Sequence, residues 1–171
     1  MKKLLSICLL ILLCLSPVYA AEQDITAHAD CDYCGMDRSK FAHSRIMIEY
    51  ADGSSAALCS LHCAAVEFAV RIDKTPLSFM VGDYNTKQLI DAKQANWVLG
   101  GEKFGVMTTR AKWAFADTAA AEQFIQQNGG MHADFDQVIK AAYEDMYSDT
   151  KMIHKKRQAK RMKKKHSKAG G

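Results

Sequence analysis

The sequence predicts an α+β protein built from two similar small ββα units that pack together, followed by a C-terminal helix and a basic tail. Short β-branched and aromatic runs between turn residues predict strands, and amphipathic runs behind capping residues predict helices. The order strand, turn, strand, cap and helix occurs twice. Ser60 precedes a helix that carries Phe68, and Asp117 precedes one that carries Phe124. We interpret the two copies as related units.

The first unit is expected to span residues 21–76. Residues 45–50 and 55–58 predict two strands, and Ala51-Asp52-Gly53-Ser54 between them is typical of a hairpin turn. Ser60 then takes the N-cap position of a helix over 61–72.

The second unit is expected to span residues 77–150. Asp117 caps a helix over 118–127 that ends at the two glycines 129 and 130, and a last helix covers 134–147. The predicted extended segments lie at 77–81, 95–99, 104–108 and 112–115, with a short segment over 87–92 to which no structure is assigned.

Residues 1–20 have the pattern of a signal peptide. Lys2 and Lys3 precede an apolar run over 4–15 that is too short to span a bilayer, and an A-x-A-like site predicts cleavage after Ala20. Neither cysteine of this segment follows the small residue that lipid attachment requires. We therefore expect a periplasmic protein with four cysteines, in an oxidising compartment.

Charge divides the mature chain into two parts. Residues 21–150 hold 11 Lys and Arg against 19 Asp and Glu, a net charge of −8, whereas residues 151–171 hold ten basic residues and no acid. We predict that 151–171 is a disordered, solvated arm, and it is a candidate for peripheral contact with anionic lipid or an acidic partner. Export argues against nucleic acid as a partner.

Four cysteines form the most distinctive pattern. Cys31 and Cys34 make a C-x2-C pair, and Cys59 and Cys63 make a C-x3-C pair after 24 intervening residues. This spacing is compatible with two disulfides, with a closed four-thiolate Zn(II) site, or with copper. Met36 favours copper, because thiolate and thioether ligands together select Cu(I). A thioredoxin-like role is less well supported, since the C-x2-C pair precedes a strand.

Two further residues are candidate ligands. His62 lies beside Cys63 in the first helical turn, where the helix dipole is expected to lower the pKa of the thiol. His62 is either a nitrogen ligand or a surface residue, and Met107, within a predicted strand, is by its pattern alone a core residue. The sequence contains no G-x-S-x-G, phosphate-binding loop or H-E-x-x-H, so no enzymatic activity is predicted.

Several of these motifs resemble the NosL family, the accessory proteins of nitrous oxide reductase. The resemblance covers about residues 31–130, and its most specific parts are the C-G-M element at 34–36 and the C-x3-C pair at 59–63. Weaker matches follow in the family's order, among them Asp83-Tyr84, Gly105-Val106-Met107 and Trp113-Ala114-Phe115-Ala116. The basic tail and the missing lipid-attachment site lie outside the family pattern.

The resemblance implies a periplasmic Cu(I) metallochaperone that delivers copper to a cupro-enzyme, for which nitrous oxide reductase is the expected client. Other copper-assembly proteins are further implied partners. The family's ligands carry over to Cys34, Met36 and Met107, with Cys31, Cys59 and Cys63 assisting or forming a second site. The alternatives are a structural or sensing zinc module and a thiol–disulfide exchange protein.

Overall fold

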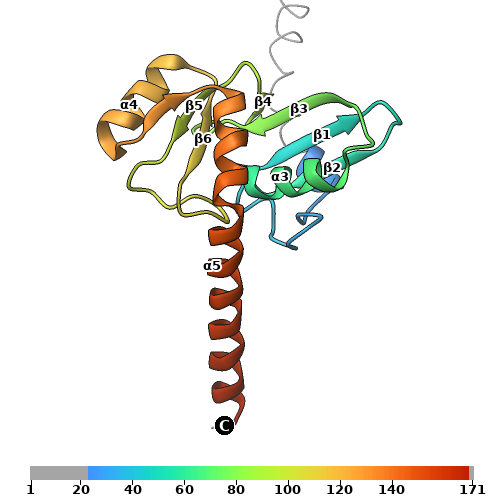
Figure 1. Ribbon diagram of the computed structural model, residues 1–171, viewed down its shortest axis with the longest axis vertical. Coiled ribbons are helices and arrows are strands. Elements are labelled where there is room, and N and C mark those ends of the chain that lie inside the picture. Colours follow the sequence, from blue (N-terminus) through green and yellow to red (C-terminus); the bar gives the residue numbers. More distant parts are fainter. Residues whose placement is uncertain (1–22, 170–171) are drawn as a thin grey trace, which may run out of the picture.

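Two antiparallel sheets form the body of the protein, which a computed structural model describes over residues 23–169 (Figure 1). The predicted signal peptide and its cleavage site after Ala20 lie outside the described residues. The arrangement confirms the α+β class, with two small units side by side and a long helix at the C-terminal end.

The first sheet has the strand order β2-β1-β3-β4, and helix α3 follows β2 directly. Ile46, Ile48 and Tyr50 alternate with less buried residues along β1, and this period of two places one face of the strand in the core. The elements of this unit are β1 (Ile46–Tyr50), β2 (Ser55–Leu58), α3 (Leu61–Val70), β3 (Pro76–Gly82) and β4 (Leu89–Asp91).

The hairpin between β1 and β2 forms where the sequence predicts it. Gly53 has a positive φ of 81°, and the Asp52 carboxylate accepts hydrogen bonds from the Ser54 amide at 2.9 Å and from the Ser54 hydroxyl. An aspartate that bonds its own turn and a glycine in the left-handed region are the usual chemistry of such turns.

The second sheet repeats the topology of the first, with the order β6-β5-β7. In both units a central strand pairs with the next strand through a hairpin connection and with a third strand that follows the helix. The predicted internal repeat is therefore ββαβ in the structure. Its elements are β5 (Asn96–Leu99), β6 (Lys112–Phe115), α4 (Thr118–Asn128) and β7 (Met131–Ala133), of which β7 was not predicted.

Two expectations about the strands need correction. Residues 104–108 form an irregular loop, because Gly105 packs closely on Ala111 and Thr108, and Met107 adopts a left-handed φ of 64° that no strand allows. Strands β3 and β4 pair within the first sheet, whereas the sequence assigned residues 77–150 to the second unit.

The two sheets are joined at the end of β3. The Tyr84 amide donates to the Ala114 carbonyl at 2.8 Å, and the buried Asp83 carboxylate accepts from the Ala116 amide at 2.7 Å. Tyr84 also packs against Trp113 and Phe124 of the second unit, with ring centroids 5.1 and 4.9 Å away. Backbone and aromatic contacts thus fix the two units as one body.

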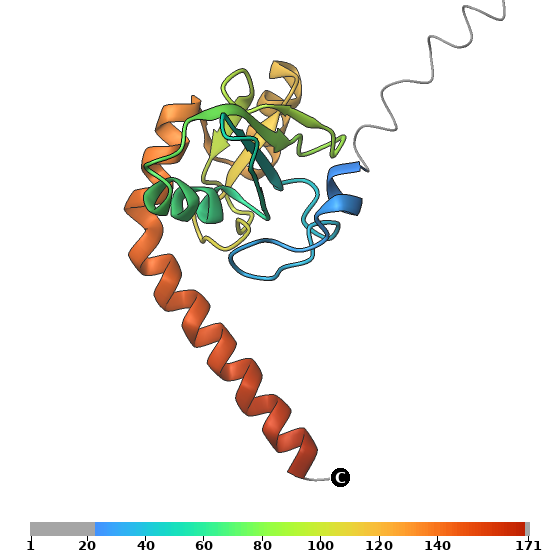
Figure 2. The ribbon, with the colours of Figure 1, turned by 90° about the vertical axis from the view of Figure 1, so that its right-hand side faces the viewer.

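Helix α5 (Phe135–Ala169) begins at a capping box and extends far beyond the body (Figures 1 and 2). Asp134 accepts from the Gln137 amide at 2.8 Å while the Gln137 side chain accepts from the Asp134 amide at 2.9 Å. Val138, Ala141 and Ala142 are buried against the body. At 1.5 Å per residue the helix is about 52 Å long.

The expectation of a disordered tail from residue 151 was wrong, since α5 continues through it to Ala169. Lys, Arg, Gln, Met and Ala all have high helix propensity, and no glycine or proline interrupts them before Gly170. A high net charge alone therefore does not prevent a helix that the body has already nucleated. No described helix combines the length and the apolar content needed to cross a membrane.

Candidate metal centre

The segment from Cys31 to Met36 folds into a tight turn that is attached to β2. The Cys31 amide donates to the Met36 carbonyl and the Gly35 amide donates to the Cys31 carbonyl, both at 2.9 Å, with Gly35 at a φ of 66°. Asp32 bonds Ala57 of β2 through both its amide and its carboxylate, at 3.0 and 2.7 Å. The turn therefore sits beside β2, the strand that Cys59 directly follows.

A buried ion network holds the chain on either side of this turn. Asp24 accepts from Arg38 at 2.8 Å and from Arg45 at 2.8 Å, and both guanidinium groups are fully buried. Arg38 also donates to the carbonyls of His28 and Ile46, at 2.7 and 3.2 Å. These bonds tie the N-terminal segment to the start of β1, with the turn between the two anchors.

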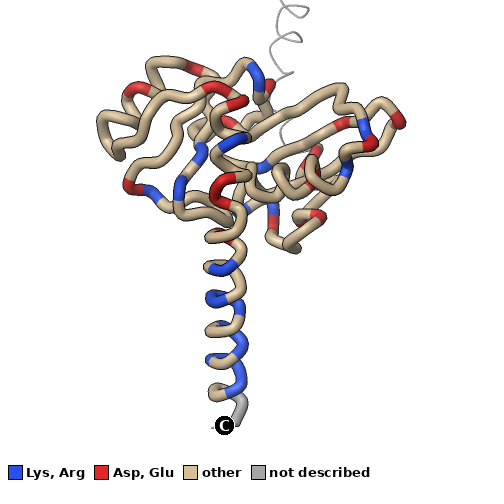
Figure 3. The backbone as a smooth tube through the Cα atoms, viewed as in Figure 1, with Lys and Arg blue, Asp and Glu red and all other residues tan. Residues whose placement is uncertain are grey.

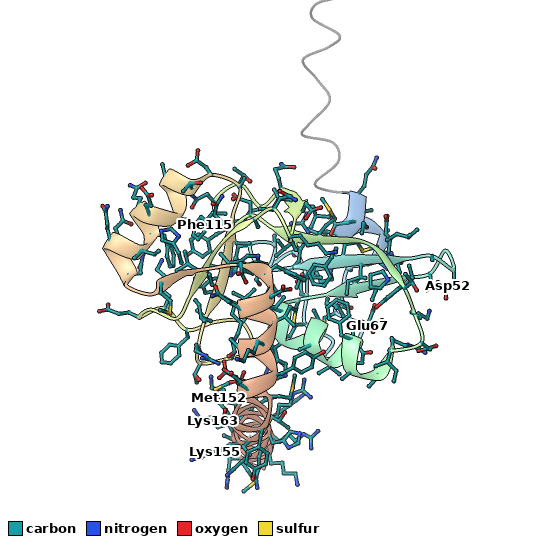
Figure 4. All side chains as sticks on the ribbon, turned by 45° about the horizontal axis from the view of Figure 1, so that its top comes forward. Asp52, Glu67, Phe115, Met152, Lys155 and Lys163 are labelled. Atoms are coloured by element: carbon teal, nitrogen blue, oxygen red, sulfur yellow. The ribbon has the colours of Figure 1, made fainter. Side chains whose placement is uncertain are left out.

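A third contact fixes the turn to α3. The buried Glu67 carboxylate accepts from the Tyr33 hydroxyl at 2.6 Å and from the Tyr50 hydroxyl at 2.7 Å. Burial, together with the Glu67 charge, raises the pKa of Tyr33 to about 12, so both phenols stay protonated and donate. Glu67, which is labelled in Figure 4, lies on α3.

These contacts bring the four predicted cysteines into one cluster. Their sulfur atoms all lie within 4.8 Å of one another, with Cys34 Sγ 3.4 Å from Cys59 Sγ and Cys59 Sγ 3.8 Å from Cys63 Sγ. All four thiols are free. Cys31, Cys59 and Cys63 are at most 3% exposed, whereas Cys34 is only half-buried. The cluster therefore opens to solvent at Cys34.

The thiols titrate as an interacting group. Hydrogen bonds from Cys34, Cys59 and Cys63 lower the pKa of Cys31, while the pKa values of Cys59 and Cys63 are raised because Cys31 and Cys34 ionise first. The pKa of Cys63 is thus raised, and not lowered as its place in the first helical turn predicted, because its hydrogen bonds to Cys31, Cys34 and Cys59 and its burial favour the thiol form.

Met107 reaches the same site from the second unit. It lines a hollow of about 210 Å3 together with Cys34, Cys63 and His62. Its left-handed backbone is unusual for a residue with a side chain, a conformation that costs on the order of 1–3 kcal/mol and is found most often at functional sites. The structure thus places Met107 at the opening of the cluster and not in a strand within the core.

Met36 lies differently from Met107. Its carbonyl closes the turn, and its half-buried side chain packs against the core. It is absent from the residues that line the hollow beside Cys34. Met36 therefore packs against the core cluster that contains Cys31, Cys59 and Cys63, without lining the hollow.

His62 is buried next to a carboxylate of α5. Its Nδ1 lies 3.6 Å from Oδ2 of Asp149, which is 1% exposed, and the other Asp149 oxygen accepts from the Thr109 amide at 3.3 Å. Burial lowers the pKa of His62 and Asp149 opposes that shift only in part. At 3.6 Å the two atoms make no hydrogen bond, and neither His62 Nδ1 nor Asp149 Oδ2 has another hydrogen-bond partner in the described part of the chain. A small shift of either side chain would bring them into the carboxylate–imidazole contact that commonly supports a histidine ligand.

Sequence reasoning missed the contribution of α5 to this site. Thr150, Ile153, His154 and Arg157 line the hollow beside Cys34. Their spacing of three, four and seven residues places them on one helix face, which is a detectable signal. It was overlooked because the segment was expected to be disordered.

Comparisons with known proteins identify a family and a similar fold. The family model described as NosL matches residues 22–143. Among solved structures, the crystal structure of the copper chaperone NosL from Shewanella denitrificans is similar, with 22% identity and a TM-score of 0.56 over 67% of this chain and 92% of that chain. At this identity the likeness supports the fold alone. The search of curated proteins found no match.

Proposed function

Because the chain belongs to the NosL family, we propose that it is a copper-binding chaperone that takes up Cu(I) at the thiol cluster and releases it to a copper enzyme. The observation that carries the proposal is the convergence of four free thiols with only Cys34 open to solvent. A chaperone needs strong ligands that a partner can still reach, and the cluster combines both properties. The role is one of binding and transfer, without catalysis.

Cys34 is proposed as the anchoring thiolate, with Met107 and Met36 as weaker thioether ligands. Met107 lines the same hollow as Cys34, which supports its assignment, and Met36 packs against the core cluster that contains the three buried cysteines. The remaining cysteines hold the ion from the buried side. His62 stands at the same hollow as an additional nitrogen ligand.

Release is proposed to proceed by ligand exchange. A partner's thiolate or imidazole approaches Cu(I) through the hollow at Cys34, displaces the thioether first, and then replaces the thiolates one by one. The buried cysteines remain protected from solvent throughout. The finer proposals, that the protein works in the periplasm and that nitrous oxide reductase receives the copper, are supported by the signal-peptide pattern and by the motif resemblance.

One observation favours a second function, a structural Zn(II) module. Zinc–sulfur bonds of about 2.3 Å place tetrahedral thiolates about 3.8 Å apart. The Cys59–Cys63 sulfur distance is 3.8 Å and the Cys34–Cys59 distance is 3.4 Å. The cluster is thus spaced for four-coordinate metal, and the two metals must be compared directly.

The deciding experiment is a competition titration of the reduced protein from Ala21 onward with Cu(I) and with Zn(II), each against a chelator of known affinity. Tight binding of one Cu(I) with weak Zn(II) supports the chaperone, and the reverse order supports the zinc module. Cys34→Ser is expected to abolish tight binding of either metal. Turnover of a disulfide substrate without metal would instead indicate thiol–disulfide exchange.

Methionine variants separate the two metals further. Met107→Leu keeps volume and removes the thioether, so Cu(I) affinity is expected to fall about tenfold, a loss of about 1.4 kcal/mol, while Zn(II) affinity is unchanged. Met47→Leu is the matched control, because Met47 lies on β1 and pairs with Ala57 and Met80 within the sheet. Equal Cu(I) affinity in the two variants would remove Met107 from the ligand set.

A further inference from the structure

The part of α5 that leaves the body is basic on every side. Between Lys151 and Lys165 it carries nine Lys and Arg residues, all exposed, and no acid (Figure 3). No ion pair within the described part of the chain includes any of the nine. The nine charges are therefore not neutralised by ion pairs with the body, although residues 21–150 carry a net charge of −8.

One face of this helix adjoins the thiol cluster. Arg157, Lys160, Arg161 and Lys164 follow a spacing of three, four and seven residues and so lie on one face. Together with Cys34 they line a hollow of about 370 Å3, and Arg157 Nη2 donates to the Cys34 carbonyl at 3.3 Å. We call these four residues the basic stripe. A partner molecule that binds the basic stripe also meets the half-buried Cys34 thiol.

The composition of the helix decides between the two anionic surfaces that could bind it. A helix that lies on a membrane buries an apolar face among the lipids and keeps its basic residues on the opposite face. Here Met152 and Ile153 are half-buried, Met162 is isolated, and the other sides carry Lys155, Lys156 and Lys163 (Figure 4). A lipid surface would also have no reason to involve the face beside Cys34 in particular.

We propose that the basic stripe is the docking surface for an acidic face of the protein that exchanges copper with Cys34. The inference rests on the proposed function, since it names the chemistry of the partner in that transfer. Opposite charges at the mouth of a site raise association rates by about 10- to 1000-fold, and the gain falls as salt is added. Docking on the stripe brings the partner's ligands to the half-buried thiol.

The experiment uses the Cu(I)-loaded chain from Ala21 onward and two synthetic acceptors. Each peptide carries one C-x2-C pair, flanked by glutamates in one and by serine and glycine in the other. Stopped-flow transfer to the acidic acceptor is expected to be at least about tenfold faster at low ionic strength, with the advantage lost near about 0.5 M salt. Transfer to the neutral acceptor should not depend on salt.

Two triple variants test whether position matters as well as charge, and both keep Arg157 because it donates to the Cys34 carbonyl. K160E/R161E/K164E reverses the rest of the stripe, and K155E/K156E/K163E makes the same charge change on the other sides of the helix. The first is expected to abolish most of the acidic acceptor's advantage and the second to retain most of it, with Cu(I) affinity for the protein unchanged in both. Circular dichroism confirms that α5 is intact in each.

The outcomes separate the inference from the function beneath it. Equal transfer to both acceptors, or equal loss in the two variants, overturns the stripe and leaves the chaperone proposal standing. Failure to transfer to either acceptor removes the chaperone function and the inference with it. Loss of phosphatidylglycerol vesicle binding only in the stripe variant, without an acidic-acceptor advantage, would make the stripe a lipid contact and also overturn the inference.

Discussion

Replacing Asp24 by asparagine should destabilise the fold and loosen the thiol-bearing turn. Asp24 is the shared carboxylate of Arg38 and Arg45, at 2.8 Å from each, and its side chain is 9% exposed. The variant keeps the shape and removes the charge, so two guanidinium groups with no solvent exposure lose their counter-ion. Charged groups buried without a partner are among the most costly features of a protein interior.

The magnitude follows from the burial of the two arginines. Removing one partner of a buried ion pair typically costs about 3–5 kcal/mol, and we expect the lower end because asparagine still accepts a hydrogen bond. For a chain of this size about 3 kcal/mol lowers the melting temperature by about 6–12 °C. Because Arg38 flanks the Cys31–Met36 turn, metal affinity should fall in the same variant.

Thermal unfolding followed by circular dichroism measures the first effect and chelator competition the second. Asp37→Asn is the matched control, since the Asp37 side chain is 40% exposed and its ion pair is with exposed Lys40. Asparagine can also keep accepting the hydrogen bonds that Ser39 and the Lys40 amide donate to Asp37. Its melting temperature should be unchanged. If the two variants melt together, the buried network does not hold this segment, and the anchoring role given to Asp24 is wrong.

Three further predictions concern the same framework. Burial raises the pKa of Asp24, but Arg45 and Arg38 outweigh burial and hold that pKa below the ordinary 3.8. The stabilisation by the Asp24 carboxylate is therefore complete above about pH 4 and should be lost as the pH falls further. Melting temperatures of wild type and Asp24→Asn, measured over a pH series, test this. Gly82→Ala would place a Cβ 2.1 Å from the Ala42 carbonyl oxygen and should cost about 1–3 kcal/mol in urea unfolding. Glu67→Gln should lower the pKa of Tyr33 from about 12, as read by absorbance titration; an unchanged titration would remove Glu67 as the cause.

Elements set by local chemistry were predictable. The β1–β2 hairpin follows from alternating burial and an Asp-Gly turn, and α4 begins at Asp117, whose carboxylate accepts from the Ala120 amide at 3.0 Å as expected. The convergence of the cysteines was also predictable, because a C-x2-C turn and a strand–helix junction need only a hairpin between them to meet. These features depend on residues close together in sequence.

Features that depend on distant packing were missed. The strand assigned to 104–108 had the right residues, but close contact of Gly105 with Ala111 and the left-handed Met107 turn it into a loop. The loop is fastened to α5 through Arg110, which bonds Asp145 at 2.9 Å and Glu144 at 2.9 Å. No local pattern encodes these contacts, so the loop could not be inferred, whereas the α5 side of the site left a helical spacing in the sequence that the expectation of disorder obscured.

The two copies of the repeat show what the thiol cluster replaces. In the second copy Asp117 caps α4 through the Ala120 amide, three residues on. At the equivalent positions of the first copy, Ser60 makes no side-chain cap to α3; its hydroxyl instead accepts from the Cys59 thiol at 3.8 Å, and Cys63 stands where Ala120 does. A missing cap costs about 1 kcal/mol. The first unit is thus less stable locally at the junction that holds its thiols, which fits a junction retained for binding rather than for folding.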